Sequence, residues 1–372
     1  MDYQAFLNRL TTSGNLRTIP QELSDTVIDM STNDYMGYAA DASLQKRFLS
    51  SSDNISIPLT SSASRLLAAT QRHYNALENK LNELYSRPAL LFNSGYHANT
   101  GLISGLTDAT DIILADKLVH ASIIDGMKLS DATHARWRHN DSHHLERLIQ
   151  RYRAEQTDAR IWIVAESVYS MDGDVAPIDT LIDLKQQYGN VMVYIDEAHA
   201  VGCMGHMGRG VVADNPRAAM VDVIVGTFGK ALASQGAFAI LSPTLREVAV
   251  NRCRSFIFST AMPPMSAAWS LFVLEHSLGH DDRRSHLAAM SARMRSNLGL
   301  KPGTHIVPYI IGDAVRTVEI SRSLLDAGIK ILPIRIPTVP PGTERLRISL
   351  NASMTESQID MVSETILNVC NR

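Results

Sequence analysis

Short apolar runs alternate with amphipathic stretches through the middle of the chain, from residue 88 to about residue 241. The runs are continuous, as expected for strands that helices cover on both faces of a sheet. They are Ala89–Phe92, Ile112–Ala115, Ile161–Ala165, Val191–Ile195, Val221–Val225 and Ala237–Leu241. Most intervals between these runs have apolar residues at helical spacing, for example 145–153 and 177–188. This rhythm predicts an α/β domain with a mostly parallel sheet.

The pattern differs toward both ends of the chain. Near the start, the apolar positions predict one helix that ends at Ser13-Gly14, a second over 42–50 and a third over 71–85. Beyond residue 275 we expect a helix over 284–298, strands near 305–311, 329–334 and 346–350, and a helix over 314–327. A last helix begins at Thr355, where Gln358 completes a capping box. The chain is therefore expected to form an N-terminal arm and loop (1–45), a large domain (46–275) and a smaller C-terminal α+β domain (276–372).

Composition narrows the class of protein. The chain has 372 residues, of which 45% are hydrophobic, enough for a large buried core. Its net charge of -3 and the lack of a basic stripe argue against nucleic acid and acidic membranes as partners. Three cysteines make no disulfide framework, and neither a secretory signal nor a membrane-length apolar stretch occurs. We expect a soluble cytoplasmic protein.

Chemically active residues follow three of the predicted strands. Glu166 comes after the run that ends at residue 165, and Asp196 and His199 come after the next run. Lys230 follows the run that ends at residue 225. Ligands of open α/β sheets bind beyond the carboxyl ends of the strands, so these side chains are expected around one crevice.

This set of residues matches what pyridoxal phosphate requires. Its aldehyde needs an amine, which Lys230 would supply as a Schiff base, and a carboxylate such as Asp196 keeps the ring nitrogen protonated. Its phosphate needs backbone N–H groups and hydroxyls, for which Gly95-Tyr96 and Thr227 are candidates. His120 is placed to cover one face of the ring. We therefore expect pyridoxal phosphate as cofactor and Lys230, Asp196 and His120 as catalytic residues.

Other motif interpretations are weaker. The D-E-A-H of 196–199 also occurs in helicases, but the chain lacks the G-x-x-x-x-G-K-[ST] loop that those enzymes need. A metal site at His199, Cys203 and His206 would need a second ligand pair with matching spacing, and none is present, so we expect no metal. The glycines of 205–210 lack the strand and helix that flank a dinucleotide fingerprint.

An ordered series of motifs from about residue 30 to 350 resembles the α-oxoamine synthases, a family of fold-type I pyridoxal-phosphate enzymes. The matching stretches are N-D-Y-M-G (33–37), D-K-L-V-H-A-S (116–122), S-M-D-G-D (170–174), D-E-A-H-A-V-G (196–202), T-F-G-K (227–230) and F-S-T-A-M-P-P (258–264). The resemblance implies the fold-type I architecture, with a mostly parallel large-domain sheet and a smaller C-terminal α+β domain. It also implies that His199 contacts the ring hydroxyl, that His120 stacks on the ring and that Ser170 lies near the ring substituents.

The resemblance further implies a homodimer with a shared active site. Thr227 and the backbone at Gly95-Tyr96 would hold the phosphate, and Ser259-Thr260 would reach the phosphate in the partner subunit. Arg347 would bind the carboxylate of the amino-acid substrate, with Asn33 nearby. Arg17 and Arg335 are candidates for contacts with the acyl donor. One departure is S-S-A-S-R at 61–65, where the family often has a glycine-rich run.

By the same resemblance, the enzyme joins an amino acid to an acyl thioester, carried by coenzyme A or a carrier protein, with loss of carbon dioxide. The stretches I-R-I-P-T-V-P (334–340) and G-T-E-R-L-R (342–347) are similar to the branch that uses L-alanine and a pimeloyl thioester in biotin biosynthesis. Two alternatives stay open. One is a ligase of the same family that uses glycine and acetyl coenzyme A, and the other is a non-catalytic regulator with this fold.

Overall fold

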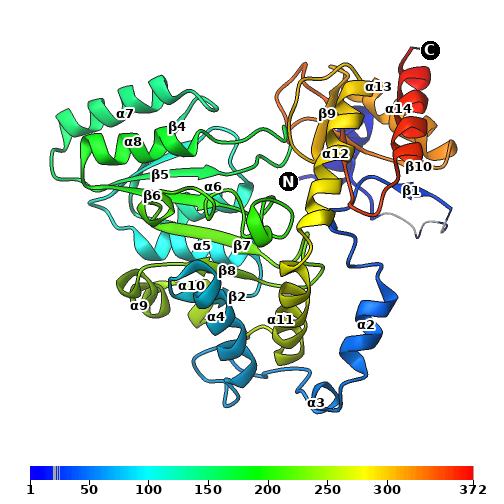
Figure 1. Cartoon of the computed structure of the whole chain (residues 1–372). Helices are drawn as coiled ribbons and strands as arrows, with labels where there is room; N and C mark the ends of the chain where they lie inside the picture. The colour runs from blue at the N-terminus through cyan, green and yellow to red at the C-terminus, as the bar shows by residue number, and fades with distance from the viewer. Residues whose placement is uncertain (20–21, 23, 25, 372) are drawn as a thin grey trace. The chain divides into compact units, whose positions relative to one another are not determined.

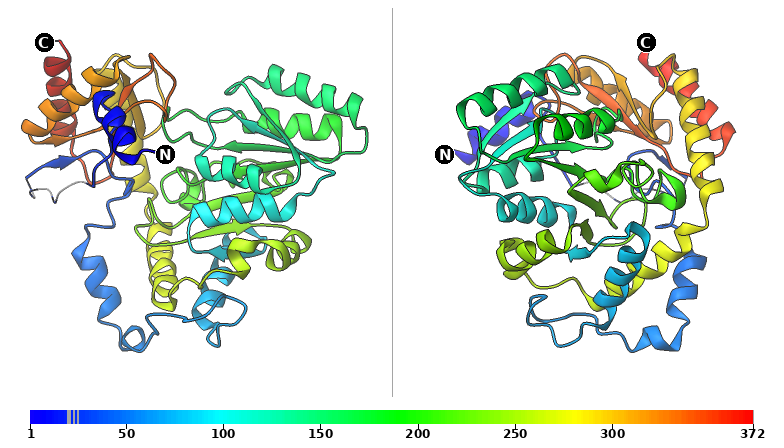
Figure 2. Two further views of the ribbon diagram at one scale, coloured as in Figure 1. Left: turned by 180° about the vertical axis from the view of Figure 1, so that it is seen from behind. Right: turned by 60° about the vertical axis from the view of Figure 1, so that its left-hand side comes forward.

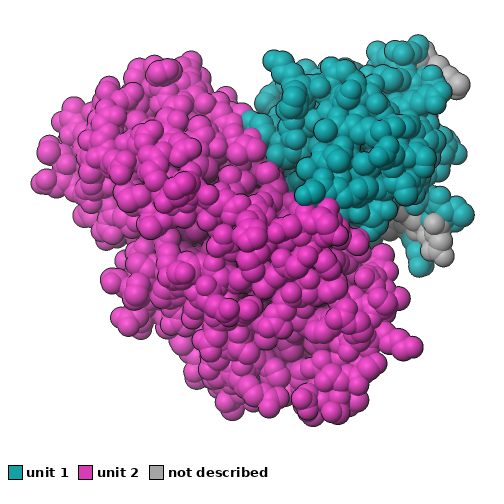
Figure 3. All heavy atoms as spheres, viewed as in Figure 1, with its two compact units in different colours: residues 1–35, 170–174, 285–372 teal, residues 36–169, 175–284 magenta. Residues whose placement is uncertain are grey.

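The computed structural model of the chain describes residues 1–19, 22, 24 and 26–371. These residues form two compact units, coloured separately in Figure 3. Unit 1 comprises residues 1–35, 170–174 and 285–372, and unit 2 comprises residues 36–169 and 175–284. The bounds of the units differ from the predicted domain boundaries at residues 45 and 275. Residues 170–174 belong to unit 1, and residues 276–284 belong to unit 2. The division into arm, large and small domains remains a prediction.

Unit 2 is built on a seven-stranded sheet with the order β2-β8-β7-β6-β5-β3-β4 (Figure 1). Its strands are β2 (Ala89–Phe92), β3 (Ile112–Asp116), β4 (Thr133–Trp137), β5 (Ile161–Glu166), β6 (Val191–Asp196), β7 (Val223–Thr227) and β8 (Ala237–Ile240). Only β8 runs antiparallel to its neighbours β2 and β7; the other described pairings in this sheet are parallel. The predicted α/β class with a mostly parallel sheet is therefore confirmed.

Helices cover both faces of this sheet. The helices of unit 2 are α2 (Ala42–Leu49), α3 (Ser52–Ile55), α4 (Arg72–Tyr85), α5 (Gly95–Leu106), α6 (Ala121–Leu129), α7 (Ser142–Glu155), α8 (Ile178–Tyr188), η1 (His206–Gly208), η2 (Ala218–Met220), α9 (Pro243–Arg252), α10 (Arg254–Ile257) and α11 (Pro264–Leu278). Helices α7 and α8 pack together against the strands on one face. On the other, α5 packs against α6 and α9, and the views of Figure 2 show α5 and α6 side by side. The central strands are buried on both faces, which explains their continuous apolar runs.

Strand β4 is the element of this sheet that the hydrophobic pattern missed. It lies at the edge of the sheet, next to β3. Its sequence is T-H-A-R-W, and of its five residues only Trp137 is buried. An exposed edge strand has no need of a continuous apolar run, so its pattern of side chains does not distinguish it from a loop.

Unit 1 contains two small sheets. Strands β11 (Leu332–Ile334), β12 (Arg345–Ser349) and β9 (Ile306–Ile310) form an antiparallel sheet in that order, and β1 (Ile28–Asp29) pairs in parallel with β10 (Ile329–Lys330). The predicted strand over 329–334 is thus divided between the two sheets. Helices α1 (Tyr3–Thr12), α13 (Ala314–Asp326) and α14 (Glu356–Cys370) belong to this unit.

Helix boundaries follow capping chemistry. At the start of α14, the Thr355 side chain accepts from the Gln358 backbone N–H, and the Gln358 side chain accepts in return from the Thr355 N–H, so the predicted capping box is confirmed.

Helix α12 (Asp281–Asn297) begins in unit 2 and ends in unit 1. Within the described ranges, we find no helix with the length and apolar character that crossing a bilayer requires.

Candidate active site

The carboxyl ends of β5, β6 and β7 lie next to one another and carry polar side chains. Glu166 and Asp196 are partners in the register of β5 and β6, and Thr227 ends β7. A pocket of about 160 Å³ opens there, within unit 2. It is lined by Gly95, Tyr96, Asn99, His120, Ser122, Glu166, Asp196, Ala198, His199, Thr227 and Lys230. The structure therefore brings together seven of the predicted site residues, namely Gly95, Tyr96, His120, Asp196, His199, Thr227 and Lys230.

Asp196 is one of two buried acids of the pocket, with 5% of its surface exposed. Its Oδ1 accepts a hydrogen bond from the Ala198 backbone N–H at 2.8 Å, and its Oδ2 accepts one from Asn99 Nδ2 at 2.7 Å. A carboxylate has about four lone-pair sites, so each oxygen can accept a further hydrogen bond. The acid is held from two sides and can still face a cationic N–H in the pocket.

Lys230 lies on the loop between β7 and β8. Within this loop the Ala233 N–H donates to the Lys230 carbonyl, and the Thr227 hydroxyl donates to the Gly236 carbonyl at 3.0 Å. The side chain places Nζ 2.9 Å from Nε2 of the buried His199. An amine and an imidazole are thus in hydrogen-bond contact inside the pocket.

His120 is positioned by the turn that follows β3. Asp116 accepts from the Leu118 N–H, and Glu166 accepts from the His120 backbone N–H. His120 is the N-cap of α6, where its Nδ1 accepts from the Ser122 N–H at 3.2 Å. His120 as a whole residue is exposed and lines the pocket, so a ligand in the pocket can contact it. Desolvation by neighbouring atoms lowers the pKa of the imidazole, Asp196 opposes this shift and Lys230 adds to it.

The N-terminus of α5 offers a site for an anion. Ser94 caps the helix by accepting the His97 N–H, and Gly95 is the first helical residue. A Cβ added at Gly95 would meet no atom within 4 Å, so open space lies above this turn. Thr227 lines the same pocket, and its hydroxyl oxygen accepts the Gly229 N–H at 3.1 Å. The first turn of a helix presents free N–H groups to an anion such as a phosphate.

Glu166 is a pocket residue to which the sequence assigned no role. It is 2% exposed, and burial together with the neighbouring charge of Asp196 raises its pKa to about 8. A carboxyl group with this pKa is mostly neutral at pH 7. Its position at a strand end is the sequence signal that identifies it.

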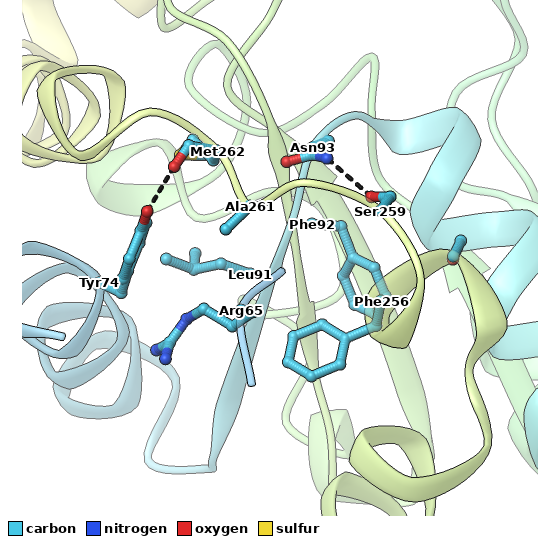
Figure 4. Close-up of a pocket in the computed structure, with 10 residues that line it drawn as sticks. Arg65, Tyr74, Leu91, Phe92, Asn93, Phe256, Ser259, Ala261 and Met262 are labelled. Atoms are coloured by element: carbon cyan, nitrogen blue, oxygen red, sulfur yellow. Dashed lines mark hydrogen bonds between the residues drawn. The ribbon is translucent and has the colours of Figure 1, made fainter. Parts of the chain in front are cut away.

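Ser259 and Thr260 do not line this pocket. They lie near a second, smaller pocket of about 20 Å³, also within unit 2, where Asn93 Nδ2 donates to Ser259 Oγ at 2.9 Å (Figure 4). Thr260 forms a β-bridge with Ser64, and the Ala261 N–H donates to the Ala63 carbonyl. The segment 61–65 lacks the glycine-rich run. It thus pairs with the segment that contains Ser259 and Thr260, which we predict reaches the phosphate of the partner subunit.

Arg347 and Asn33 are brought together in unit 1. Arg347 is 3% exposed, and its Nη2 donates to Asn33 Oδ1 and to the Tyr35 hydroxyl, each at 3.2 Å. Its Nη1 donates to Ser349 Oγ and its Nε to the Ser170 carbonyl, both at 2.6 Å. These bonds use four of the five guanidinium N–H groups. Arg347, which we predict binds the substrate carboxylate, is thus oriented by contacts within the protein.

Ser170 belongs to the excursion 170–174, which lies in unit 1 although the chain enters and leaves it from unit 2. Asp172 accepts from the buried Arg345, which also donates to the Met171 carbonyl. Thr304 Oγ1 donates to the Gly173 carbonyl at 2.7 Å. The predicted role of Ser170 beside the cofactor ring remains a prediction.

Arg17 and Arg335 occupy one region of unit 1. Arg17 Nη2 donates to Thr338 Oγ1 at 3.2 Å, and Arg335 Nη2 donates to the Leu16 carbonyl at 3.1 Å. Desolvation lowers the pKa of Arg335, and the nearby charge of Arg17 lowers it further. Two cations close together suit an anionic ligand.

The residues of the main pocket fit pyridoxal phosphate. The space above Gly95 suits the phosphate, Asp196 can accept from the ring nitrogen, and Lys230 supplies the amine. His120 lines the same pocket and can stack on the ring. The fit rests on four separate features, each from a different strand end or helix start.

Comparisons with known proteins agree with this site. The model of the aminotransferase class I and II family matches residues 25–366. A Pasteurella multocida protein provisionally named 8-amino-7-oxononanoate synthase is 41% identical over 96% of each chain. Among solved structures, serine palmitoyltransferase of S. paucimobilis with bound PLP–myriocin aldimine has a TM-score of 0.90 at 26% identity, covering 99% of this chain and 96% of that chain. The 8-amino-7-oxononanoate synthase of Francisella tularensis has a TM-score of 0.76 at 26% identity, covering 93% and 98%.

Family model, relatives and pocket all lead to one assignment. The chain uses pyridoxal phosphate as its cofactor, as the sequence predicted. It belongs to the aminotransferase class I and II family and, within it, to the α-oxoamine synthases, which are pyridoxal-phosphate-dependent acyltransferases.

Proposed function

We propose that this enzyme condenses L-alanine with a pimeloyl thioester to give 8-amino-7-oxononanoate, carbon dioxide and the free thiol carrier, a step of biotin biosynthesis. The observation that carries the chemistry is the pocket that both Lys230 and Asp196 line, beyond the ends of neighbouring strands. The choice of substrates is supported by the P. multocida relative, which matches the chain over 96% of both lengths.

The cofactor supplies an aldehyde for the substrate amine and a ring that withdraws electrons from Cα. Lys230 Nζ removes the Cα proton and later returns one, since it is the amine in the pocket. Asp196 would pair with the ring nitrogen, and His120 would cover the ring. Thr227 and the backbone at Gly95-Tyr96 would bind the phosphate, and His199 would contact the ring hydroxyl.

Substrate binding is proposed for the cluster in unit 1. Arg347 binds the alanine carboxylate, with Asn33 beside it, because its guanidinium is a cation and its fifth N–H can donate to the carboxylate. Arg17 and Arg335 contact the acyl donor. A homodimer is part of the proposal, in which Ser259 and Thr260 extend toward the phosphate of the partner subunit.

The test is a thiol-release assay on the purified protein supplied with pyridoxal phosphate. Alanine, glycine and serine are each paired with pimeloyl, acetyl and palmitoyl coenzyme A, and with a pimeloyl carrier protein. Alanine with a pimeloyl thioester should give the highest kcat/KM, with one thiol and one carbon dioxide released per amino ketone. A preference for glycine with the acetyl thioester would reject the proposal in favour of the ligase.

A second candidate is favoured by the structural likeness to serine palmitoyltransferase, which has the higher TM-score of the two solved structures. In that case serine and the palmitoyl thioester would be the best pair in the same assay. An 8-amino-7-oxononanoate synthase should turn over this pair at least ~100-fold more slowly than alanine with pimeloyl thioester, a difference of about 2.7 kcal/mol in transition-state binding.

Asp196→Asn tests the role of the buried acid. The amide keeps the shape of the side chain but carries no negative charge to stabilise a protonated ring nitrogen. The variant should bind the cofactor and lose most turnover. Turnover equal to that of the wild type would contradict the role.

A further inference from the structure

Asn99 is a fully buried polar residue on the apolar helix α5, and it lines the cofactor pocket. Its exposure is 1%, and those of its partners Tyr194 and Ser122 are 1% and 0%. Asn99 Nδ2 donates to Asp196 Oδ2 at 2.7 Å and to Ser122 Oγ at 2.9 Å. The Tyr194 hydroxyl donates to Asn99 Oδ1 at 2.7 Å. One side-chain amide thus connects three elements around the pocket.

The partners leave the amide of Asn99 one orientation. If it were flipped, its oxygen would lie 2.7 Å from the oxygen of a carboxylate at Asp196, and two acceptors would face each other. Burial raises the pKa of Tyr194 well above its usual value, so its hydroxyl keeps the proton that it donates to Oδ1. Tyr194 therefore directs the NH2 group of Asn99 toward Asp196 and Ser122.

The second N–H of Asn99 acts on His120 through Ser122. Because Ser122 Oγ accepts from Asn99, its own proton is available for His120 Nδ1, 2.8 Å away. The Ser122 backbone N–H also donates to Nδ1, at 3.2 Å. The backbone N–H is a donor whatever the tautomer, and a ring nitrogen that accepts from it carries no proton. The ring is then neutral, with its proton on Nε2, and the lowered pKa of His120 agrees with this state.

We propose that Asn99 is a positioning residue that fixes both the Asp196 carboxylate and the Nε2–H tautomer of His120 through its single NH2 group. His120 then presents a hydrogen-bond donor, not a base, to an oxygen of the substrate. This last step rests on the proposed function, whereas the two contacts of Asn99 depend only on the residues of the pocket.

The test combines three variants with two readouts that need no substrate. Asn99→Ala removes the whole connection, Tyr194→Phe removes one hydroxyl and Ser122→Ala removes the link to His120. The readouts are the dissociation constant of pyridoxal phosphate and the ¹⁵N resonances of histidine-labelled holoenzyme, with His120→Asn identifying the His120 signals. Ser104→Ala is the matched control, because Ser104 lies on the same helix and bonds to the helix carbonyl of Thr100.

Asn99→Ala should weaken cofactor binding roughly 10- to 100-fold, as expected for loss of a hydrogen bond to a charged group. Tyr194→Phe should weaken it roughly 3- to 10-fold and keep the fold if Asn99→Ala does not. Ser122→Ala should change the tautomer ratio of His120, and Ser104→Ala should change neither readout. The wild-type spectrum should show Nδ1 without a proton.

Either of two results would overturn the proposal. One is a wild-type His120 that carries its proton on Nδ1. The other is cofactor affinity and His120 signals in folded Asn99→Ala and Tyr194→Phe that equal those of the wild type. If alanine and pimeloyl thioester prove to be the wrong substrates, the thiol-release assay fails while both of these readouts keep their expected values, so the two failures are distinguishable.

Discussion

Replacing Gly173 with alanine tests how the excursion 170–174 is held. Gly173 has a φ of +65°, and a Cβ built on it would lie 2.0 Å from the Ile306 carbonyl oxygen. The left-handed backbone alone costs a residue other than glycine roughly 1–2 kcal/mol. The clash adds to this, because an ordinary contact is about 3.4 Å or longer. The carbonyl of Ile306 must therefore move by more than 1 Å.

That movement has its own cost, because the Ile306 carbonyl accepts a hydrogen bond from the buried Arg295 at 2.7 Å. A charged donor left without its partner costs roughly 1.5–3 kcal/mol. Gly173→Ala should thus lower the free energy of unfolding by about 2.5–5 kcal/mol. It should also raise KM for the amino acid, since the Ser170 carbonyl that orients Arg347 belongs to the same excursion.

Gly299→Ala is the matched control. Gly299 lies in the same unit, has the same φ of +65°, and its added Cβ would meet no atom within 4 Å. It should show the backbone cost alone, about 1–2 kcal/mol. Urea unfolding of both variants gives the comparison. Equal destabilisation would refute the reasoning, because it would mean that the close approach to Ile306 contributes nothing.

Three further predictions concern single side chains. Lys230→Ala should leave a folded protein that lacks the visible absorbance of covalently held cofactor and has no activity; full activity would reject its role. Glu166 has a pKa of about 8 against an ordinary value of 4.5, so the stability from its neutral form is complete below pH 4.5 and is lost as the pH rises toward 8. Glu166→Gln, melted without cofactor across this pH range, should flatten that loss, and an unchanged slope would contradict the assignment. Asp172→Ala should destabilise the protein by roughly 1–3 kcal/mol, because the buried Arg345 loses its ion-pair partner, and a calorimetric melt equal to wild type would exclude this.

Sequence reasoning reached the α/β architecture because the central strands are buried on both faces and need continuous apolar runs. It reached Asp196, His199 and Lys230 because strand ends meet at one edge of a parallel sheet. Neither argument depends on side-chain orientation. Both work with the positions of residues along the chain.

The features of the fold and of the site that the sequence did not predict depend on contacts between residues far apart in the chain. The close approach of Gly173 to Ile306 joins positions 133 residues apart, and no local pattern encodes it. Asn99 and Tyr194 were also missed, although each is a polar residue within an apolar segment. Such an interruption signals a buried hydrogen bond, but it does not identify the partner.

The loop that carries Lys230 has a consequence for protein engineering. Because β8 returns directly beside β7 without a crossover helix, nine residues span from Phe228 to Gly236, and the Phe228 N–H and the Thr227 hydroxyl both bond to the Gly236 carbonyl. The reach of the amine is therefore set by the torsions of one side chain. Redesigns that alter substrate size can lengthen loops elsewhere in the sheet, whereas a single inserted residue here would displace the nucleophile itself.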